Sequence, residues 1–324
     1  MELFESLVEK IKGKNKKIVF PEGNDVRVVK AVVRLAEDKL ISSVILGNEN
    51  EVKELAGVSR LPAGISVIDV TSYPSDKFEE MIAAFVDRRK GKNTPEQARK
   101  MLKDVNYFGT MLVYMGVADG LVSGAVHPTG DTVRPALQII KTKPGTTRTS
   151  GAFVMTRENE KYLFADCAIN INPNEQELAE IAVESIQTAR LFDIDPKVAM
   201  LSFSTKGSAK SDEVTKVAKA TALAKELAPS EQIDGELQFD AAFVESVAAK
   251  KAPNSEVAGK ANVFVFPELQ SGNIGYKIAQ RFGGFEAVGP ILQGLNKPIS
   301  DLSRGANEND IYKVAIITAL QATL

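Results

Sequence analysis

The feature that most constrains the fold is an alternation of short apolar runs with stretches of helical periodicity. Three early runs have strand length and end in polar or glycine-containing turns: residues 17–20, 43–47 and 66–70. Apolar residues at helical spacing fill the neighbouring segments: residues 2–12, 25–39 and 52–56. Strands that are separated by helices pair in parallel, because the chain crosses over the sheet before it begins the next strand. This part of the chain therefore predicts a parallel sheet with helices on both faces.

The same alternation continues through the rest of the chain, with one interruption. Further helical patterns occupy residues 75–90, 94–102, 107–114, 175–192 and 212–227. Further strand-like runs occupy residues 119–124, 151–156, 161–168, 196–203, 235–239 and 262–266. Between the two halves, the polar stretch KTKPGTTRTS contains proline and glycine, which is typical of a connection between domains. A length of 324 residues suits two domains, so we predict an α/β fold with two domains built on mostly parallel sheets.

The composition excludes several classes of function. Lys and Arg number 40 against 42 Asp and Glu, for a net charge of -2, so no basic surface for nucleic acid is expected. One Cys and one His exclude a disulfide within the chain and a Cys/His metal cluster. The start MELFES lacks the pattern of a signal peptide, and no apolar run reaches the length of a membrane span. We expect a soluble, cytoplasmic protein without a metal, nucleic-acid or membrane partner.

Polar loops follow several of the predicted strands: residues 123–134, 204–212, 267–277 and 298–310. Ligands of parallel sheets collect at the carboxyl ends of the strands, so these loops form the candidate site. Their Arg, Lys, Ser and Gly residues favour a phosphate-bearing substrate that is held by hydrogen bonds and cations. Lys206 and the hydroxyls beside it suit a phosphate, although a capped helix start explains the same residues. Neither a Walker P-loop nor a G-x-G-x-x-G dinucleotide fingerprint is present.

Charged residues near two predicted helix starts fit more than one interpretation. Asn307 predicts an N-cap, and Asp310 falls in the first turn, where a carboxylate complements the helix dipole. Arg304, just before that helix, suits a bound anion. Arg134 lies close to a helix start predicted near residue 131, where a cation is unfavourable unless an anion is nearby, yet it also fits a plain surface arginine.

Three further side chains have a structural as well as a functional interpretation. Arg88 and Arg89 belong to a basic run that ends a helix, which fits either a solvated helix end or a landing site for a ligand phosphate. The lone His127 is interpreted as structural, so we do not assign it as a catalytic base. Cys167 lies in an apolar run and is predicted to be a buried, inert thiol.

Seven short segments together carry a resemblance to a known family. They are FPEG at 20–23, YFGTM at 107–111, SGAVH at 123–127, TVRPALQIIKT at 132–142, FSTKGS at 203–208, GNIGYK at 272–277 and DLSRG at 301–305. In these segments, and over essentially its whole length, the chain resembles the phosphate acetyltransferases (phosphotransacetylases) in their short, single-module form. Members of that family interconvert acetyl phosphate plus coenzyme A with acetyl-CoA plus phosphate.

The resemblance implies a fold and an assembly as well as an activity. It implies a two-domain layout similar to that of isocitrate dehydrogenases, with the active site in the cleft between the domains. The C-terminal segment returns to the first domain in such proteins, so the expected domains are 1–146 with 297–324, and 147–296. A homodimer is also implied, with coenzyme A as a co-substrate and no tightly bound cofactor.

The resemblance also assigns roles to particular residues. The catalytic Ser-Arg pair of the family falls on Ser303 and Arg304, and its catalytic Asp on Asp310. Its coenzyme A-binding arginines fall on Arg134 and on one member of the pair Arg88 and Arg89. Position 306 is Ala where relatives often carry Cys, and we attach no role to it. The residues expected to hold the phosphoryl or acyl group are Ser204, Thr205, Lys206 and Asn273.

These roles define an expected mechanism. A free thiol has a pKa of about 8.5, so the coenzyme thiol gains from a base. Asp310 is expected to accept that proton. Because an ordinary carboxylate is a weak base, Asp310 is expected either to be partly buried or to act as the thiol engages. The thiolate attacks the carbonyl of acetyl phosphate, while Arg304 and Ser303 stabilise the growing negative charge. Direct transfer in a ternary complex is favoured over a covalent acyl-enzyme, because Cys167 has no histidine partner.

Two other activities stay open as alternatives. A phosphate butyryltransferase differs only in the size of its acyl pocket. A nicotinamide-dependent hydroxy-acid dehydrogenase shares the implied layout, although neither the dinucleotide fingerprint nor an evident acidic metal cluster is present in the sequence.

Overall fold

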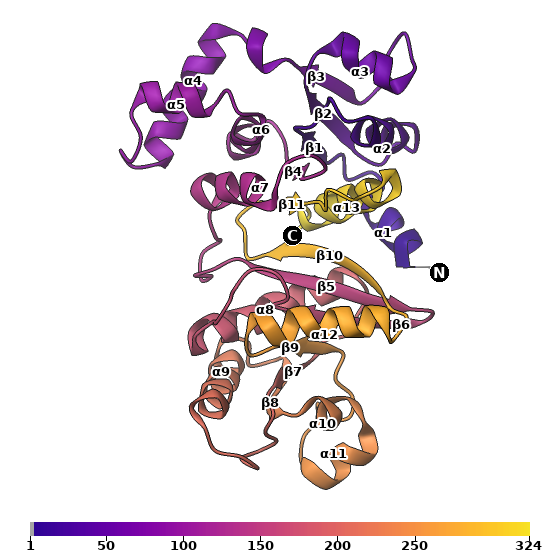
Figure 1. Cartoon of the computed structure of the whole chain (residues 1–324), viewed down its shortest axis with the longest axis vertical. Coiled ribbons are helices and arrows are strands. Elements are labelled where there is room, and N and C mark those ends of the chain that lie inside the picture. Colours follow the sequence, from indigo (N-terminus) through magenta and orange to yellow (C-terminus); the bar gives the residue numbers. More distant parts are fainter. Residues whose placement is uncertain (1–2) are drawn as a thin grey trace. The chain divides into compact units, whose positions relative to one another are not determined.

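The computed structural model describes residues 3–324, and the chain forms two compact units. Unit 1 comprises Met1–Lys143 and Leu295–Leu324, and unit 2 comprises Pro144–Gly294. Both units are α/β assemblies whose sheets are mostly parallel and flanked by helices, which confirms the predicted fold class (Figure 1). The limits 1–146 with 297–324, and 147–296, stay a prediction of where independently folding domains end. The predicted helix start at residue 2 lies outside the described residues.

Unit 1 is built on a five-stranded sheet in which every pairing is parallel. The sheet has the order β11–β4–β1–β2–β3, so β1 lies at its centre. The strands are β1 Lys17–Phe20, β2 Ser42–Leu46, β3 Ile65–Ile68, β4 Gly120–Ser123 and β11 Ile299–Asp301. Helices cover both faces of this sheet, which is why β1, β2 and β4 are continuous apolar runs rather than alternating ones.

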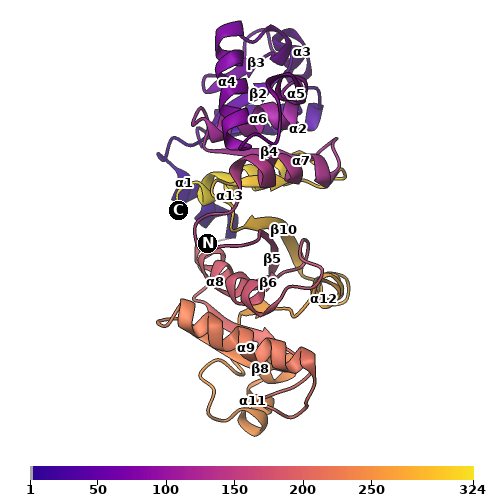
Figure 2. The ribbon, with the colours of Figure 1, turned by 90° about the vertical axis from the view of Figure 1, so that its left-hand side faces the viewer.

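The helices of unit 1 divide between the two faces of its sheet. They are α1 Leu3–Ile11, α2 Val26–Glu37, α3 Glu49–Ala56, α4 Ser75–Arg88, α5 Pro95–Met101, α6 Val105–Tyr114, α7 Thr129–Pro135 and α13 Glu308–Gln321, with a 3₁₀ turn at Val70–Ser72 and a π-helical turn, η2, at Ala136–Ile140. One face carries α4, α5, α6 and η2 around the buried Phe85 and Phe108. The other face carries α2 and α13, which pack against each other (Figures 1 and 2).

Unit 2 is built on a six-stranded mixed sheet of order β10–β5–β6–β9–β7–β8. Its strands are β5 Ser150–Arg157, β6 Glu160–Ala165, β7 Lys197–Leu201, β8 Gln232–Leu237, β9 Val263–Val265 and β10 Glu286–Gln293. The hairpin β5–β6 and the pairing of β10 with β5 are antiparallel, and the remaining pairings are parallel. The two strand-like runs predicted at 151–156 and 161–168 therefore form a hairpin.

Helices also flank the sheet of unit 2. They are α8 Glu175–Leu191, α9 Asp212–Leu227, α10 Phe239–Phe243, α11 Glu245–Lys251 and α12 Leu269–Arg281. α8 and α9 pack together on one face, and α12 lies on the other (Figure 2). The strand predicted at 235–239 instead runs from Gln232 to Leu237. The prediction began too late because Asp234 is polar and interrupts the apolar run. In the structure this carboxylate is buried and pairs with Lys206 and Lys225, so the strand includes it. No helix within residues 3–324 combines the length and apolar character that a bilayer crossing requires.

Candidate active site

The carboxyl ends of three strands meet at one place in unit 1. The strand order reverses between β1 and β4, because the chain builds β2 and β3 on one side of β1 and adds β4 and β11 on the other. In open parallel sheets, such a switch point is where ligands bind. The segments that leave the three strands there are residues 21–25, 124–128 and 302–307. The last of them contains Ser303 and Arg304.

The buried Glu22 organises this edge of the sheet. Its side chain is 1% exposed, and its two carboxylate oxygens accept hydrogen bonds from four consecutive main-chain N–H groups. Oε2 accepts from Gly124 (3.1 Å) and Ala125 (2.8 Å), and Oε1 accepts from Val126 (2.9 Å) and His127 (3.0 Å). The first N–H groups of the polar loop 123–134 therefore already bind a carboxylate of the protein, so they are not available to an anionic ligand.

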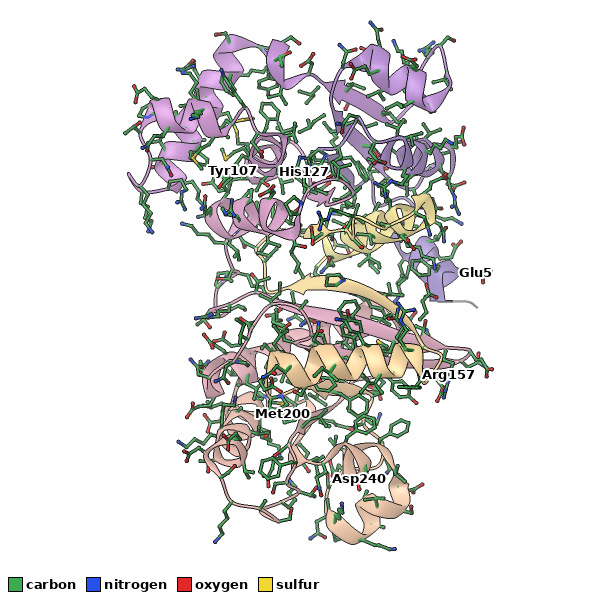
Figure 3. The ribbon with its side chains drawn as sticks, viewed as in Figure 1. Glu5, Tyr107, His127, Arg157, Met200 and Asp240 are labelled. Carbon is green, nitrogen blue, oxygen red and sulfur yellow. The ribbon has the colours of Figure 1, made fainter. Side chains whose placement is uncertain are left out.

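His127 takes part in the same arrangement. Its Nδ1 lies 2.7 Å from Oε1 of Glu22, so the ring adds a fifth nitrogen around this carboxylate. The residue, labelled in Figure 3, lies two positions before the start of α7 at Thr129. This contact agrees with the interpretation of the single histidine as structural, which stays a prediction.

Arg27 joins the loop 302–307 to the loop 124–128. Its Nη1 donates to the main-chain oxygens of Arg304 (2.9 Å) and Ala306 (2.7 Å), and its Nη2 donates to the oxygen of Ala125 (2.9 Å). The N-cap residue of α2, Asp25, pairs with the same guanidinium at 2.7 Å. Burial raises the pKa of Asp25, but hydrogen bonds from Arg27 and from the main chain outweigh it, so this pKa lies below its usual value.

The sequence analysis missed Arg27. A signal for it exists, because an arginine in the first turn of a helix stands at the end where the helix dipole disfavours a cation. The same dipole argument was used for Arg134, on the premise that this residue stands near the start of a helix. The structure contradicts that premise. Arg134 lies in the last turn of α7, and its side chain is 62% exposed with Asp131 3.9 Å away.

The predicted catalytic pair, Ser303 and Arg304, is exposed at the surface of unit 1. The Ser303 hydroxyl accepts a hydrogen bond from the N–H of Gly305 at 3.2 Å, which leaves its own proton free to be donated. Within the described part of the chain, no hydrogen bond or ion pair engages the guanidinium of Arg304. The main chain of Arg304 is thus fixed by Arg27, whereas its charged end is available to a ligand.

Asp310 has the predicted place at the start of α13. Its Oδ2 accepts from the N–H of Asn307, and its own N–H donates to Oδ1 of Asn307, both at 2.9 Å. This reciprocal capping box confirms Asn307 as the N-cap. Of the two expectations for Asp310, partial burial is wrong, because the residue is exposed. The third position of a capping box points back along the outside of the first turn, where solvent reaches it.

The predicted arginines that bind coenzyme A lie around one phenol. Burial raises the pKa of Tyr107, whereas the charges of Arg134 and Arg89 act in the opposite direction, so both cations lie near this ring. The Tyr107 hydroxyl donates to Oε1 of Gln138 at 2.9 Å, and Figure 3 shows Tyr107 on α6. Arg134 and Arg89, which are 45 residues apart by their numbers, therefore both act electrostatically on Tyr107.

Arg88 differs from its neighbour Arg89. The Arg88 guanidinium donates to the main-chain oxygens of Ile139 (2.5 Å) and Ile140 (2.7 Å), so it closes the carboxyl end of η2. Among residues 3–324, the side chain of Arg89 makes one hydrogen bond, from Nε to the side-chain Oδ1 of Asn93 (3.0 Å). Burial and then the charges of Arg88, Lys90, Arg89 and Lys92 lower the pKa of Lys141. Positive charge is thus concentrated here, and most of the donors of Arg89 remain available to a ligand.

The candidates on the 204–212 loop of unit 2 already have internal partners. The buried Ser204 hydroxyl donates to Oε1 of Glu236 (3.1 Å), and Thr205 Oγ1 donates to Oε1 of Gln238 (3.1 Å). Lys206 Nζ donates to Oδ1 of Asp234 (2.5 Å).

Asp234 is the anion that holds this loop. Burial raises its pKa, but hydrogen bonds from Lys206 and Ser255, with the charge of Lys206, outweigh burial and bring the pKa to about 2. Because Lys225 also lies 3.1 Å from the same oxygen, two ammonium groups share one carboxylate. The polar groups of this loop therefore serve the packing of unit 2.

Asn273 lies on a helix, so the prediction of a loop over 267–277 is wrong. Helix α12 begins at Leu269, because Glu268 caps it by accepting from the N–H groups of Gln270 (2.7 Å) and Ser271 (2.8 Å). Asn273 Nδ2 donates to the main-chain oxygen of Cys167 at 3.1 Å.

Cys167 itself is fully buried, and burial raises the pKa of its thiol well above the ordinary value. The prediction of a buried, inert thiol is therefore confirmed. Among residues 3–324, no group of three or more His, Cys, Asp or Glu side chains is arranged to hold a metal ion.

Comparison with known proteins bears on the whole chain. The family described as phosphate acetyl/butaryl transferase matches residues 2–319. The phosphate acetyltransferase of Bacillus subtilis (strain 168) is 63% identical over 322 residues, which cover 99% of both chains. The crystal structure of a phosphotransacetylase from Streptococcus pyogenes is 63% identical with a TM-score of 0.96, covering 99% of this chain and 98% of that one.

A more distant solved structure shares the fold alone. It is a branched-chain phosphotransacylase from Enterococcus faecalis V583, which is 17% identical, with a TM-score of 0.66 over 94% of this chain and 99% of its own.

Proposed function

The chain belongs to the phosphate acetyl/butaryl transferase family, and from this premise we propose that it transfers an acetyl group reversibly between acetyl phosphate and coenzyme A. The products in the forward direction are acetyl-CoA and phosphate. The observation that carries the proposal is the 63% identity, over 99% of both chains, to a relative named phosphate acetyltransferase. The chain is thus a transferase rather than a dehydrogenase, and coenzyme A is its co-substrate.

The proposed reaction is a direct transfer in a ternary complex. The coenzyme thiol loses its proton, its sulfur bonds to the carbonyl carbon, and the bond from that carbon to the phosphate oxygen breaks. Negative charge grows on the carbonyl oxygen and then on the departing phosphate. Arg304 suits this charge because its guanidinium has no internal partner within the described residues. Ser303 can donate its hydroxyl proton to the same charge, since that oxygen already accepts from Gly305.

Asp310 is the proposed proton acceptor. Its Oδ2 is engaged by the main chain of Asn307, whereas Oδ1 is directed to no partner among the hydrogen bonds of the described residues. The capping bonds fix the carboxylate relative to the first turn of α13. A base that is held in place and remains accessible can meet the incoming thiol in a reactive geometry. Because an exposed carboxylate is a weak base, Asp310 is proposed to accept the proton as the sulfur bonds to the carbonyl carbon.

Coenzyme A is proposed to bind at the cluster of positive charge around Tyr107. Arg134 is mostly exposed, and Arg89 retains free donors, whereas Arg88 closes η2. We therefore propose Arg134 and Arg89 as the contacts to the phosphates of the coenzyme. Guanidinium groups bind phosphate through paired N–H donors, which a lysine in the same cluster cannot offer.

The unit 2 residues of the predicted site are kept as proposed contacts to the phosphoryl or acyl group: Ser204, Thr205, Lys206 and Asn273. Each must exchange an internal hydrogen bond for one to the substrate. Because of this requirement, we expect their substitution to reduce activity less than substitution of the exposed residues of unit 1.

We also propose that the chain acts as a homodimer in the cytoplasm. Ile274 and Ile278 on α12 and Phe282 at its C-cap follow one another at intervals of four and are 57%, 53% and 92% exposed. Such a stripe on one helix face is typical of a surface that packs against another protein chain. Ile278→Asp with Phe282→Asp should turn a dimer into a monomer in light scattering. A monomeric wild type would contradict the proposal, and fractionation of the producing cells tests the location.

The activity is tested by thioester formation from acetyl phosphate and coenzyme A with the purified protein. Butyryl phosphate in place of acetyl phosphate should give a slower rate, and NAD should not be reduced in the presence of hydroxy acids. A faster rate with butyryl phosphate would make the chain a butyryltransferase. A folded protein that forms no thioester would overturn the proposal.

A further inference from the structure

We propose that Glu22 is a positioning residue for acetyl transfer, which acts through the loop of Ser303 and Arg304 without touching the substrate. The proposal rests on the function proposed above. Glu22 belongs to the first turn after β1, and the groups that it binds belong to the turn after β4, 102 residues or more away. Its carboxylate is therefore a cross-link between the two strands that flank the switch point.

The cross-link is saturated with donors. Four main-chain N–H groups and the ring of His127 surround two oxygens at distances of 2.7 to 3.1 Å. A carboxylate accepts all of these bonds, because it offers two oxygens and carries no proton of its own. A glutamine has one acceptor oxygen, and its amide hydrogens would face the main-chain N–H groups that the second oxygen now binds. The loop 124–127 therefore depends on a negative charge at position 22.

The main chain of Ala125 links Glu22 to Arg27. Its N–H donates to Glu22, and the carbonyl of the same residue accepts from Arg27. The other terminal nitrogen of Arg27 donates to the oxygens of Arg304 and Ala306. A continuous path of hydrogen bonds thus runs from Glu22 to the main chain on both sides of Gly305. Because Arg304 is fixed by its main chain rather than by its guanidinium, a shift of Ala125 moves the charged end of Arg304.

The path predicts that the effects of Glu22 and Arg304 are not independent. Misplacement of a catalytic group by about 1 Å can cost about 100-fold in rate. We expect Glu22→Gln to lower kcat about 10- to 100-fold at saturating substrates, measured well below the unfolding temperature of the variant. In a chain that already carries Arg304→Ala, the same change should lower kcat by a clearly smaller factor, because one of the two groups that it misplaces is gone.

A matched control lies at the opposite edge of the same strands. Asp119 Oδ2 accepts from the N–H of Lys17 at 2.8 Å, so it also links the segments of β1 and β4 through one carboxylate. Asp119 stands at the amino ends of these strands, away from the switch point. An asparagine keeps one acceptor oxygen for this single bond, so Asp119→Asn should leave thermal stability, kcat and both KM values near those of the wild type.

The decisive experiment measures kcat, both KM values and thermal unfolding for the wild type, Glu22→Gln, Arg304→Ala, the double variant and Asp119→Asn. Glu22→Asp keeps the charge and shortens the side chain, so it carries the test if Glu22→Gln does not fold, and it should give an intermediate kcat. Equal fold-losses from Glu22→Gln in both backgrounds, or a folded Glu22 variant with wild-type kcat, would overturn the proposal. A folded wild type without activity would instead overturn the proposed function, and the role of Glu22 with it.

Discussion

Each unit contains a buried carboxylate that accepts four main-chain N–H bonds and one side-chain nitrogen, but the two carboxylates do different things. Glu22 in unit 1 and Asp166 in unit 2 are 1% and 2% exposed. Asp166 accepts from the main chain of Gly151 (3.1 Å), Ala168 (2.8 Å), Ile169 (3.1 Å) and Asn170 (2.8 Å), and from the amide side chain of Asn170 (2.7 Å). We call such a buried carboxylate with its surrounding N–H donors a cradle, and the chemistry of the two cradles is the same.

The difference lies in which parts of the chain the two carboxylates connect. Three of the four N–H groups around Asp166 follow it within four residues, so it closes its own turn after β6. All four N–H groups around Glu22 lie more than 100 residues away, and their loop leads on to Arg27 and Arg304. A local cradle stabilises a turn, whereas a long-range cradle also sets the position of one functional loop relative to another.

Arg304→Ala should have the largest effect, because it removes the charged end of the loop that the Glu22 cradle serves. We expect kcat to fall about 10²- to 10³-fold, as for the loss of a donor that stabilises a developing oxyanion. Circular dichroism and thermal unfolding should remain close to those of the wild type, since the guanidinium has no partner within the described residues. A rate near that of the wild type would remove Arg304 from the mechanism.

Asp166→Asn tests the other side of the comparison. It leaves buried N–H groups without an acceptor and should lower the free energy of unfolding by about 2–3 kcal/mol. Below the unfolding temperature, kcat should fall much less than in Glu22→Gln. The two carboxylates would be equivalent, and the comparison wrong, if both variants lost stability and kcat in the same proportion.

Arg88 and Arg89 provide a smaller contrast within unit 1. Arg89→Met should raise the KM for coenzyme A about 10-fold, which is the scale of one lost charge-assisted hydrogen bond, and leave the KM for acetyl phosphate almost unchanged. Arg88→Met should mainly lower the unfolding temperature, because two carbonyls of η2 lose their donor. Steady-state kinetics of the two variants would contradict the assignment if Arg88 had the larger effect on the KM for coenzyme A.

The smallest effect is a pH dependence of stability in unit 2. The pKa of Asp234 is about 2 in the folded chain, below its ordinary value of 3.8. A lowered folded-state pKa stabilises the protein above the unfolded-state pKa, and this contribution is lost as pH falls from about 4 through about 2. The difference in unfolding temperature between the wild type and Asp234→Asn should therefore be larger at pH 5 than at pH 3. A difference that grows on acidification would have the wrong sign.

The sequence predicted what depends on local pattern. Strands that are covered on both faces are continuous apolar runs, and the cap Asn307 acts on an N–H group three residues away. The Glu22 cradle has no local pattern, since its partners lie in another part of the chain. Arg27 had a local signal in its place in the first turn of α2, but its acceptors are main-chain oxygens of distant residues, which no local pattern indicates.

The segment 267–277 shows how tertiary contact overrides local preference. Its glycines and Asn273 have low helix propensity, which favours a loop. Yet a Cβ atom at Gly272 would come within 2.2 Å of the main-chain oxygen of Asp166, so the glycine lets α12 approach that turn. A weak helix former is therefore required where the helix packs most closely.

The most direct test of direct acetyl transfer at the Ser303–Arg304 loop is isotope exchange between labelled phosphate and acetyl phosphate in the absence of coenzyme A. Direct attack by the thiolate leaves no acetyl group on the protein, so no label should enter acetyl phosphate until coenzyme A is added. Addition of coenzyme A should start the exchange in the wild type and leave it about 10²- to 10³-fold slower in Arg304→Ala. Exchange without coenzyme A would show a covalent acetyl-enzyme and contradict the account.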